Sequence, residues 1–104
     1  MKGRYDPRHV LVSVEKLDAA WRADAPGTYV EPGGEGAQPG YESAKQSILA
    51  GNWTPPCVSL TDGKVVFTDG RHHFAAARDL GRQSVVVEVE PAEHAEKFRE
   101  RFGT

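Results

Sequence analysis

The sequence has a single cysteine, Cys57, and no long run of apolar residues. One cysteine excludes an internal disulfide and a zinc site built from several cysteines. A membrane-spanning helix needs about twenty predominantly apolar residues, and the sequence contains no such stretch. Residues 1–7 also lack the apolar stretch of a secretory signal. We therefore expect a cytoplasmic protein that does not span a membrane.

The chain also lacks an excess of charge of one sign. Thirteen Lys and Arg residues face fifteen Asp and Glu residues, which gives a formal net charge of −2. This balance argues against a domain whose whole surface is basic, but it leaves room for a local basic patch. The 104 residues, 38 % of them hydrophobic, suffice for one domain with a small core.

Of the eleven glycines and seven prolines, five glycines and three prolines lie in residues 24–40. Neither a helix nor a strand can propagate through this composition, so we predict a flexible Gly/Pro-rich loop inside a single domain of residues 1–104. A floppy surface excursion is the preferred interpretation, and a lid over a ligand is the alternative. The segment matches neither a P-loop nor a dinucleotide-binding glycine motif.

Hydrophobic periodicity predicts alternating short strands and helices along the rest of the chain. The Asp62-Gly63 pair between two apolar runs indicates a β-hairpin. The order predicts an α+β (mixed α/β) domain with a short mixed sheet flanked by helices. The predicted strands are 9–14, 57–60, 64–68 and 84–89, and the predicted helices are 14–22, 41–50, 71–80 and 92–102.

The most informative segment is the corner at which the third predicted strand runs directly into a helix. Gly70 permits the tight backbone of such a corner, and Asp69 is expected to cap the helix. The remaining free amides and the helix dipole form an anion site suited to phosphate. We therefore predict a phosphate or nucleic-acid-binding site formed by Thr68, Asp69, Gly70, Arg71, His72 and His73.

Three residues of this corner carry side chains that can hold a positive charge. Arg71 offers a planar fork for phosphate oxygens. His72 and His73 can donate a hydrogen bond or move a proton near neutral pH, which makes them candidate catalytic residues. Adjacent residues on a helix point about 100° apart, so both histidines are not expected to face one ligand squarely.

The corner and its context resemble the ParB/sulfiredoxin superfamily, also called the ParB-like nuclease domain. Members carry a Gly-x-His/Arg-Arg-x-x-Ala box at a strand-to-helix corner, and this chain has a similar run at residues 69–76, followed by Leu80-Gly81 and a valine-rich strand. The likeness spans roughly residues 41–90. Upstream it rests on the segment 43–51 and on Trp53, Pro55, Pro56 and Val58.

The chain departs from this family at two positions of the box. Sulfiredoxins have a catalytic cysteine where this chain has Arg71, so sulfiredoxin reductase activity is not expected. ParB-type members usually have an arginine where His73 stands, which weakens the expected phosphate binding without abolishing it. Chromosome-partitioning members continue into a helix-turn-helix domain. This chain ends at Thr104, so sequence-specific operator recognition is not expected.

The resemblance implies a phosphate-binding core used on nucleotides or on a nucleic-acid backbone. The first hypothesis is a domain that binds the DNA backbone without strong sequence specificity, in a plasmid or phage context, with weak nuclease activity. A histidine would then act as general acid or base, and Arg71 would stabilise charge. The acidic balance requires the positive charge to gather on one face, which a homodimer would favour.

Two alternatives come from other classes of protein. One is a nucleotide-binding switch or small phosphotransferase, with CTP or ATP and Mg²⁺ at the same corner. No metal ligand is assigned, but Asp69 or Glu42 would lie near the Mg²⁺ ion if one is used. The other is a non-catalytic interaction module whose corner is purely structural.

Two further residues have a functional and a structural interpretation. Trp53 could stack on a base, but we prefer an anchor that packs its connection onto the core. Cys57 lies in an apolar strand and is interpreted as a buried, inert thiol.

Overall fold

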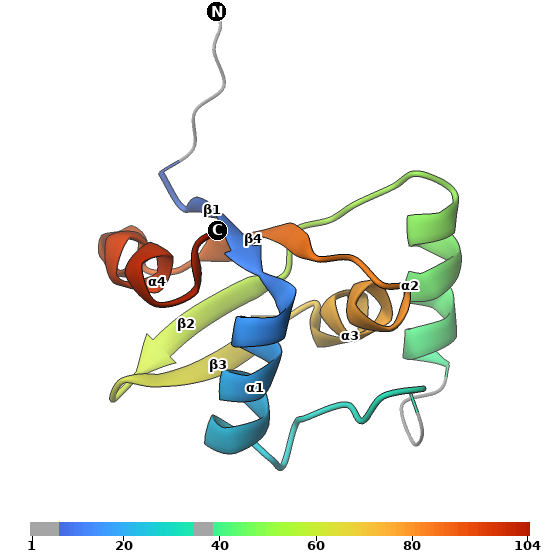
Figure 1. The fold of residues 1–104 in the computed structure, drawn as a ribbon, viewed down its shortest axis with the longest axis horizontal. Coiled ribbons are helices and arrows are strands. Elements are labelled where there is room, and N and C mark those ends of the chain that lie inside the picture. Colours follow the sequence, from blue (N-terminus) through green and yellow to red (C-terminus); the bar gives the residue numbers. More distant parts are fainter. Residues whose placement is uncertain (1–6, 35–38) are drawn as a thin grey trace, which may run out of the picture.

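The computed structural model describes residues 7–34 and 39–104. These residues form a four-stranded sheet and its helices, shown in Figure 1. None of these helices combines the length and apolar composition that a bilayer crossing requires. The elements are β1 (His9–Ser13), α1 (Val14–Asp24), α2 (Gly40–Leu49), β2 (Cys57–Thr61), β3 (Lys64–Asp69), α3 (Arg71–Asp79), β4 (Ser84–Val89), the short 3₁₀ helix η1 (Ala92–His94) and α4 (Ala95–Phe102).

The sheet has the strand order β1-β4-β2-β3. β1 pairs antiparallel with β4, β2 pairs antiparallel with β3, and β2 and β4 pair in parallel. The predicted α+β class with a short mixed sheet is therefore confirmed. The predicted hairpin is also present, because Asp62 and Gly63 both adopt the positive φ angles that a tight turn between β2 and β3 requires.

The core lies against one face of this sheet. Alternate residues of the strands are buried, as the period of a half-covered sheet requires. Trp21 of α1, Phe67 of β3 and Phe74 of α3 meet there, with ring centroids 4.6 Å apart for Trp21 and Phe67 and 5.2 Å apart for Phe67 and Phe74. These aromatic contacts fix α1 and α3 on the same side of β3.

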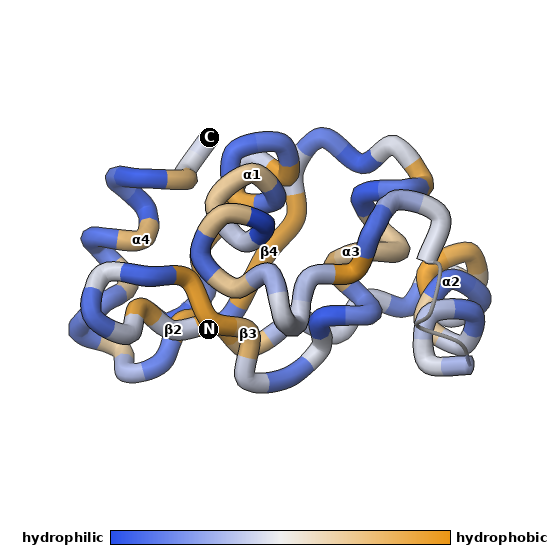
Figure 2. Tube along the Cα trace, turned by 90° about the horizontal axis from the view of Figure 1, so that it is seen from below, coloured by the Kyte–Doolittle hydropathy of each residue, from blue (hydrophilic) through white to orange (hydrophobic). Residues whose placement is uncertain are grey.

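The two ends of the molecule are formed by α4 and α2. α4 buries Phe98 and Phe102 beside β1, while its trace in Figure 2 is otherwise mostly hydrophilic. A bridge between Val12 and Gly103 ties the end of this helix to β1. At the opposite end, α2 packs on α3, which lies between it and the sheet in Figure 1.

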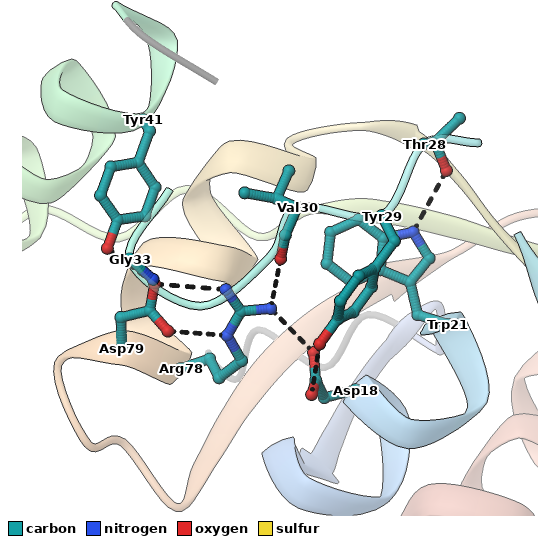
Figure 3. A network of polar contacts seen from close by, with 9 residues as sticks. All are labelled: Asp18, Trp21, Thr28, Tyr29, Val30, Gly33, Tyr41, Arg78 and Asp79. Carbon is teal, nitrogen blue, oxygen red and sulfur yellow. Dashed lines mark hydrogen bonds and ion pairs between the residues drawn. The ribbon is translucent and has the colours of Figure 1, made fainter. Parts of the chain in front are cut away.

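The segment before α2 has no regular structure in its described part, but it is firmly attached. Arg78 of α3 donates to the backbone oxygen of Val30 at 2.7 Å, and Asp79 accepts from the backbone N–H of Gly33 at 2.8 Å (Figure 3). The Tyr29 hydroxyl donates to Asp18 of α1 at 2.9 Å. Residues 25–34 are therefore tied by hydrogen bonds to α1 and α3, and the interpretation as a lid over a ligand stays a prediction. At the bounds of the predicted loop, Asp24 belongs to α1 and Gly40 begins α2, and residues 35–38 lie outside the described residues.

Candidate functional site

The corner between β3 and α3 has the predicted geometry at Gly70. β3 ends at Asp69, α3 begins at Arg71, and Gly70 between them has φ +78°, a left-handed conformation. A Cβ atom at this position would also lie 2.9 Å from the Cα of Pro56. Gly70 is therefore required twice, once by its backbone angle and once by the close approach of a neighbouring chain segment.

The expected cap of the helix is absent, which is a correction to the role of Asp69. The cap position belongs to Gly70, one residue later than expected, and no side chain in the described part of the chain caps the helix. The first helical hydrogen bond runs from the amide of Phe74 to the oxygen of Gly70. The amides of the first turn therefore have neither a helical partner nor a capping carboxylate, and they are available to an anion.

Two hollows flank the corner, and together they are lined by all six predicted site residues. A hollow of about 170 Å³ lies on the β3 side and is bordered by Thr68 and Arg71. A second hollow, of about 320 Å³, lies on the α2 side and is bordered by Ser43, Ser47 and His73. Asp69, Gly70 and His72 line both. Thr68 also donates a hydrogen bond of 3.1 Å to the backbone oxygen of Cys57, so its hydroxyl serves the structure as well.

The larger hollow has a second helix N-terminus that the sequence analysis missed. α2 begins at Gly40, its cap residue is Pro39, and the described residues supply no capping side chain there. A Cβ atom at Gly40 would lie 2.7 Å from Nδ1 of His72, so the starts of α2 and α3 are in contact. The Pro39-Gly40 pair before a helical pattern was the available signal, but its proximity to the corner depends on tertiary packing.

The two histidines have different surroundings, although both line the larger hollow. Partial burial, together with the neighbouring Arg71 guanidinium, lowers the pKa of His72 below its ordinary value of 6.5. His73 lies edge-on to the Trp53 ring at 5.5 Å between centroids. Its Nε2 is buried and has no hydrogen-bond partner among the described residues. This nitrogen is therefore a polar group in need of a partner.

Trp53 is an anchor of the connection, as the preferred interpretation held. Its Nε1 donates to the backbone oxygen of Val86 at 3.0 Å, and its ring packs partly buried against the core. Cys57 differs from expectation because it is only half-buried. Burial, together with the nearby Glu90, raises the pKa of its thiol.

Positive charge at the corner is limited. Arg71 is the one Lys or Arg among the described residues that lines either hollow. Arg78, at the other end of α3, bonds Asp18 at 3.0 Å and Asp79 at 2.8 Å. Arg99 pairs with Glu96 on α4. The corner thus offers one arginine, two histidines and free amides, which suits one or a few phosphate groups better than a long polyanion.

The two carboxylates considered as alternatives for Mg²⁺ lie on different elements. Asp69 is exposed at the corner and Glu42 is exposed on the first turn of α2. The group of acidic and thiol side chains that converges within the described residues is Cys57, Glu88 and Glu90, none of which lines either hollow.

Comparison with family models, curated proteins and solved structures finds no match to this chain. The resemblance to the ParB/sulfiredoxin superfamily therefore stays a prediction from residues 41–90.

Proposed function

We propose that the Asp69–His73 corner binds the phosphate groups of a small nucleotide. The observation that carries this proposal is the pair of helix N-termini, those of α3 and α2, that border one hollow without capping side chains in the described residues. Uncapped helix N-termini bind phosphate through their free amides and the positive end of the dipole.

Arg71, His72 and His73 of the corner, together with two serines of α2, have roles in this binding. The amides of Arg71, His72 and His73 donate to phosphate oxygens, and the Arg71 guanidinium provides a fork for two of them. The hydroxyls of Ser43 and Ser47 border the larger hollow, where a second phosphate or a ribose would lie. We propose binding here and assign no reaction to the histidines.

The limited charge favours a nucleotide over the DNA backbone that was the first hypothesis. A protein that binds the duplex backbone neutralises several phosphates with lysines and arginines. The two hollows hold Arg71 alone of these types within the described residues, and the pKa of His72 is lowered by burial and by that arginine. This arrangement supports contacts to one short phosphate chain.

An NMR titration of the full chain tests the proposal. ATP, CTP and a short DNA duplex are added in turn, with and without Mg²⁺, and the backbone amides are followed. We expect ATP or CTP to shift the amides of residues 70–73 and 40–43. Duplex DNA that shifts these amides instead, with an affinity that falls steeply with salt, would support the backbone hypothesis. If none of these ligands shifts the amides, the proposal is contradicted and the non-catalytic interaction module is the remaining hypothesis.

A matched pair of arginine variants sharpens this test. Arg71→Ala removes the fork at the corner, and Arg82→Ala removes an exposed arginine that lines neither hollow. A hydrogen bond to a charged group contributes about 1.5–3 kcal/mol, so Arg71→Ala should weaken nucleotide binding about tenfold or more. Equal affinity in the two variants, both folded, would contradict the proposal.

A further inference from the structure

A set of metal-binding side chains lies outside the corner, on the open face of the sheet. His9 of β1 pairs with Glu88 of β4, and Glu88 pairs with Cys57 of β2, so these three residues form one row across three neighbouring strands. Paired positions present their side chains on the same face. The adjacent residues in each strand are buried valines, which places the row on the face away from the core.

The donor atoms of this row come close together. The Sγ of Cys57 and carboxylate oxygens of Glu88 and Glu90 all lie within 4.8 Å of one another. Nε2 of His9 lies 3.4 Å from Oε1 of Glu88. Four donors bonded tetrahedrally to one ion at about 2.0–2.3 Å are separated by about 3.3–3.8 Å. The donors of Cys57, Glu88 and Glu90 are therefore close to the spacing that one ion requires. His9 contacts this group through Glu88, and its ring must turn further to join them.

The mixture of donors selects the kind of metal. Thiolate, imidazole and carboxylate groups are each zinc ligands, whereas Mg²⁺ and Ca²⁺ prefer oxygen ligands. The set is neither an acidic cluster nor an isolated thiol, because nitrogen, sulfur and oxygen donors from three strands converge.

A positive charge already occupies the neighbourhood of these carboxylates. Nη1 of Arg8 lies 2.9 Å from Oε2 of Glu90 and 3.4 Å from Oε2 of Glu88. The carboxylates are thus held together by a cation that a metal ion would replace. A hollow of about 610 Å³, bordered by Arg8, Ser59 and Glu90, lies beside this group.

We propose that His9, Cys57, Glu88 and Glu90 form a binding site for one Zn²⁺ ion. The thiol of Cys57 loses its proton to solvent when the Zn–S bond forms, and Arg8 moves away from the two glutamates. The site lies on the open face of the sheet and does not depend on nucleotide binding at the corner.

Co²⁺, which adopts zinc sites and reports its ligands by absorption, is the probe for the first experiment. The untagged full chain is titrated with Co²⁺, and we expect a thiolate-to-cobalt charge-transfer band that saturates at one equivalent and disappears when Zn²⁺ is added. Cys57→Ser should lose the band. A wild-type protein that shows no such band would overturn the proposal without reference to any variant.

Zn²⁺ affinity, measured by competition with a chromophoric chelator, tests the other ligands. Glu88→Gln should weaken Zn²⁺ binding about tenfold or more, while Glu93→Gln, at an exposed position outside the group, should leave it unchanged. Arg8→Gln should raise the affinity, because it removes the competing cation. Folding of each variant is checked by circular dichroism. Equal affinities of Glu88→Gln and Glu93→Gln, or weaker binding by Arg8→Gln, would contradict the site.

Discussion

The structure requires glycine more strictly at Gly70 than at Gly81. Gly70 and Gly81 both have positive φ angles, +78° and +85°. A Cβ atom at Gly70 would meet the backbone of Pro56, whereas a Cβ atom at Gly81 meets nothing within 4 Å. The sequence predicted both glycines correctly, because a strand-to-helix corner and a helix end call for this residue. The contact between Gly70 and Pro56 could not be predicted from the sequence, because the two residues approach each other only in the folded chain.

Substitution of these two glycines by alanine separates strain from contact. Gly81→Ala should lose about 1–2 kcal/mol from the left-handed backbone angle alone. Gly70→Ala should lose this amount and more, because Pro56 must move as well. Urea unfolding of both variants measures the difference. An equal loss of unfolding free energy in the two variants would mean that the close approach of Pro56 does not add to the cost of Gly70→Ala.

The carboxylate of Asp79 accepts hydrogen bonds from three different residues. Arg78 donates to it at 2.8 Å, the Tyr41 hydroxyl at 2.7 Å and the Gly33 amide at 2.8 Å. Burial acts in the opposite direction, but these hydrogen bonds outweigh it and hold the pKa of Asp79 below its ordinary value of 3.8. The same contact and burial raise the pKa of Tyr41 to about 12, with burial as the larger cause.

The lowered pKa of Asp79 makes stability depend on pH at the acid end. A carboxyl group whose pKa is lower in the folded state stabilises above its unfolded pKa, and this contribution disappears as pH falls through the folded pKa. Asp79→Asn should therefore cost about 1.5–3 kcal/mol at pH 7 and show a shallower loss of stability below about pH 4. Asp62→Asn, at an exposed turn, is the control. Parallel acid-unfolding curves for Asp79→Asn and wild type would rule out this role.

At the scale of elements, the starts of α2 and α3 are brought together by contacts that sequence reasoning does not reveal. Periodicity predicted both helices, and composition predicted the lack of regular structure before α2. The anchoring of residues 25–34 depends on Arg78 and Asp79, which lie far away in the sequence and carry no local signal. The expected Asp69 cap failed for a local reason. The helix begins at Arg71 as predicted, so the cap position next to it belongs to Gly70, which has no side chain that could cap it.

The contact between Gly40 and His72 gives a test at this scale. Gly40→Ala places a methyl group where the His72 ring now lies, so the ring must rotate into or away from the larger hollow. We expect weaker ATP binding, by about threefold to tenfold on the scale of one lost hydrogen bond, and a shifted His72 ring signal in NMR spectra. Stability should stay close to that of wild type, because alanine is the better helix former.

Gly27→Ala is the matched control for that variant. Gly27 has nothing within 4 Å of a would-be Cβ and lies in the connection before α2. An unchanged His72 ring signal in Gly40→Ala would contradict the proposed contact between Gly40 and His72. An equal loss of ATP binding in Gly27→Ala would show that the loss does not come from this contact.

The whole molecule is small, and its stability rests on a few large side chains. Phe98 and Phe102 of α4 are buried beside β1, with ring centroids 4.9 Å apart. The sequence predicted that Ala95, Phe98 and Phe102 share the inward face of this helix, because a 3.6-residue period is visible in eight residues. The strand order of the sheet could not be predicted from the sequence, because neither β2 nor β4 carries a signal for their parallel pairing.

Removal of one of these rings should therefore be costly. Phe98→Ala should cost about 3–5 kcal/mol, a large part of the roughly 5–15 kcal/mol that holds a domain folded. Lys97→Ala, one residue earlier on the exposed side of α4, should change stability by less than about 0.5 kcal/mol. Thermal unfolding measures both. A small loss for Phe98→Ala would mean that α4 is not integral to the core.

The strand order also decides when the chain can fold during synthesis. The described pairing partner of β1 is β4, the last strand to be made, and β4 lies between β1 and the β2-β3 hairpin. Such a long-range closure is slow and comes late. A nascent chain on the ribosome can form the hairpin early, but β1 remains without its neighbour until Ser84–Val89 has left the exit tunnel. The emergence of Ser84–Val89 from the ribosome is thus the event after which the native strand order can form.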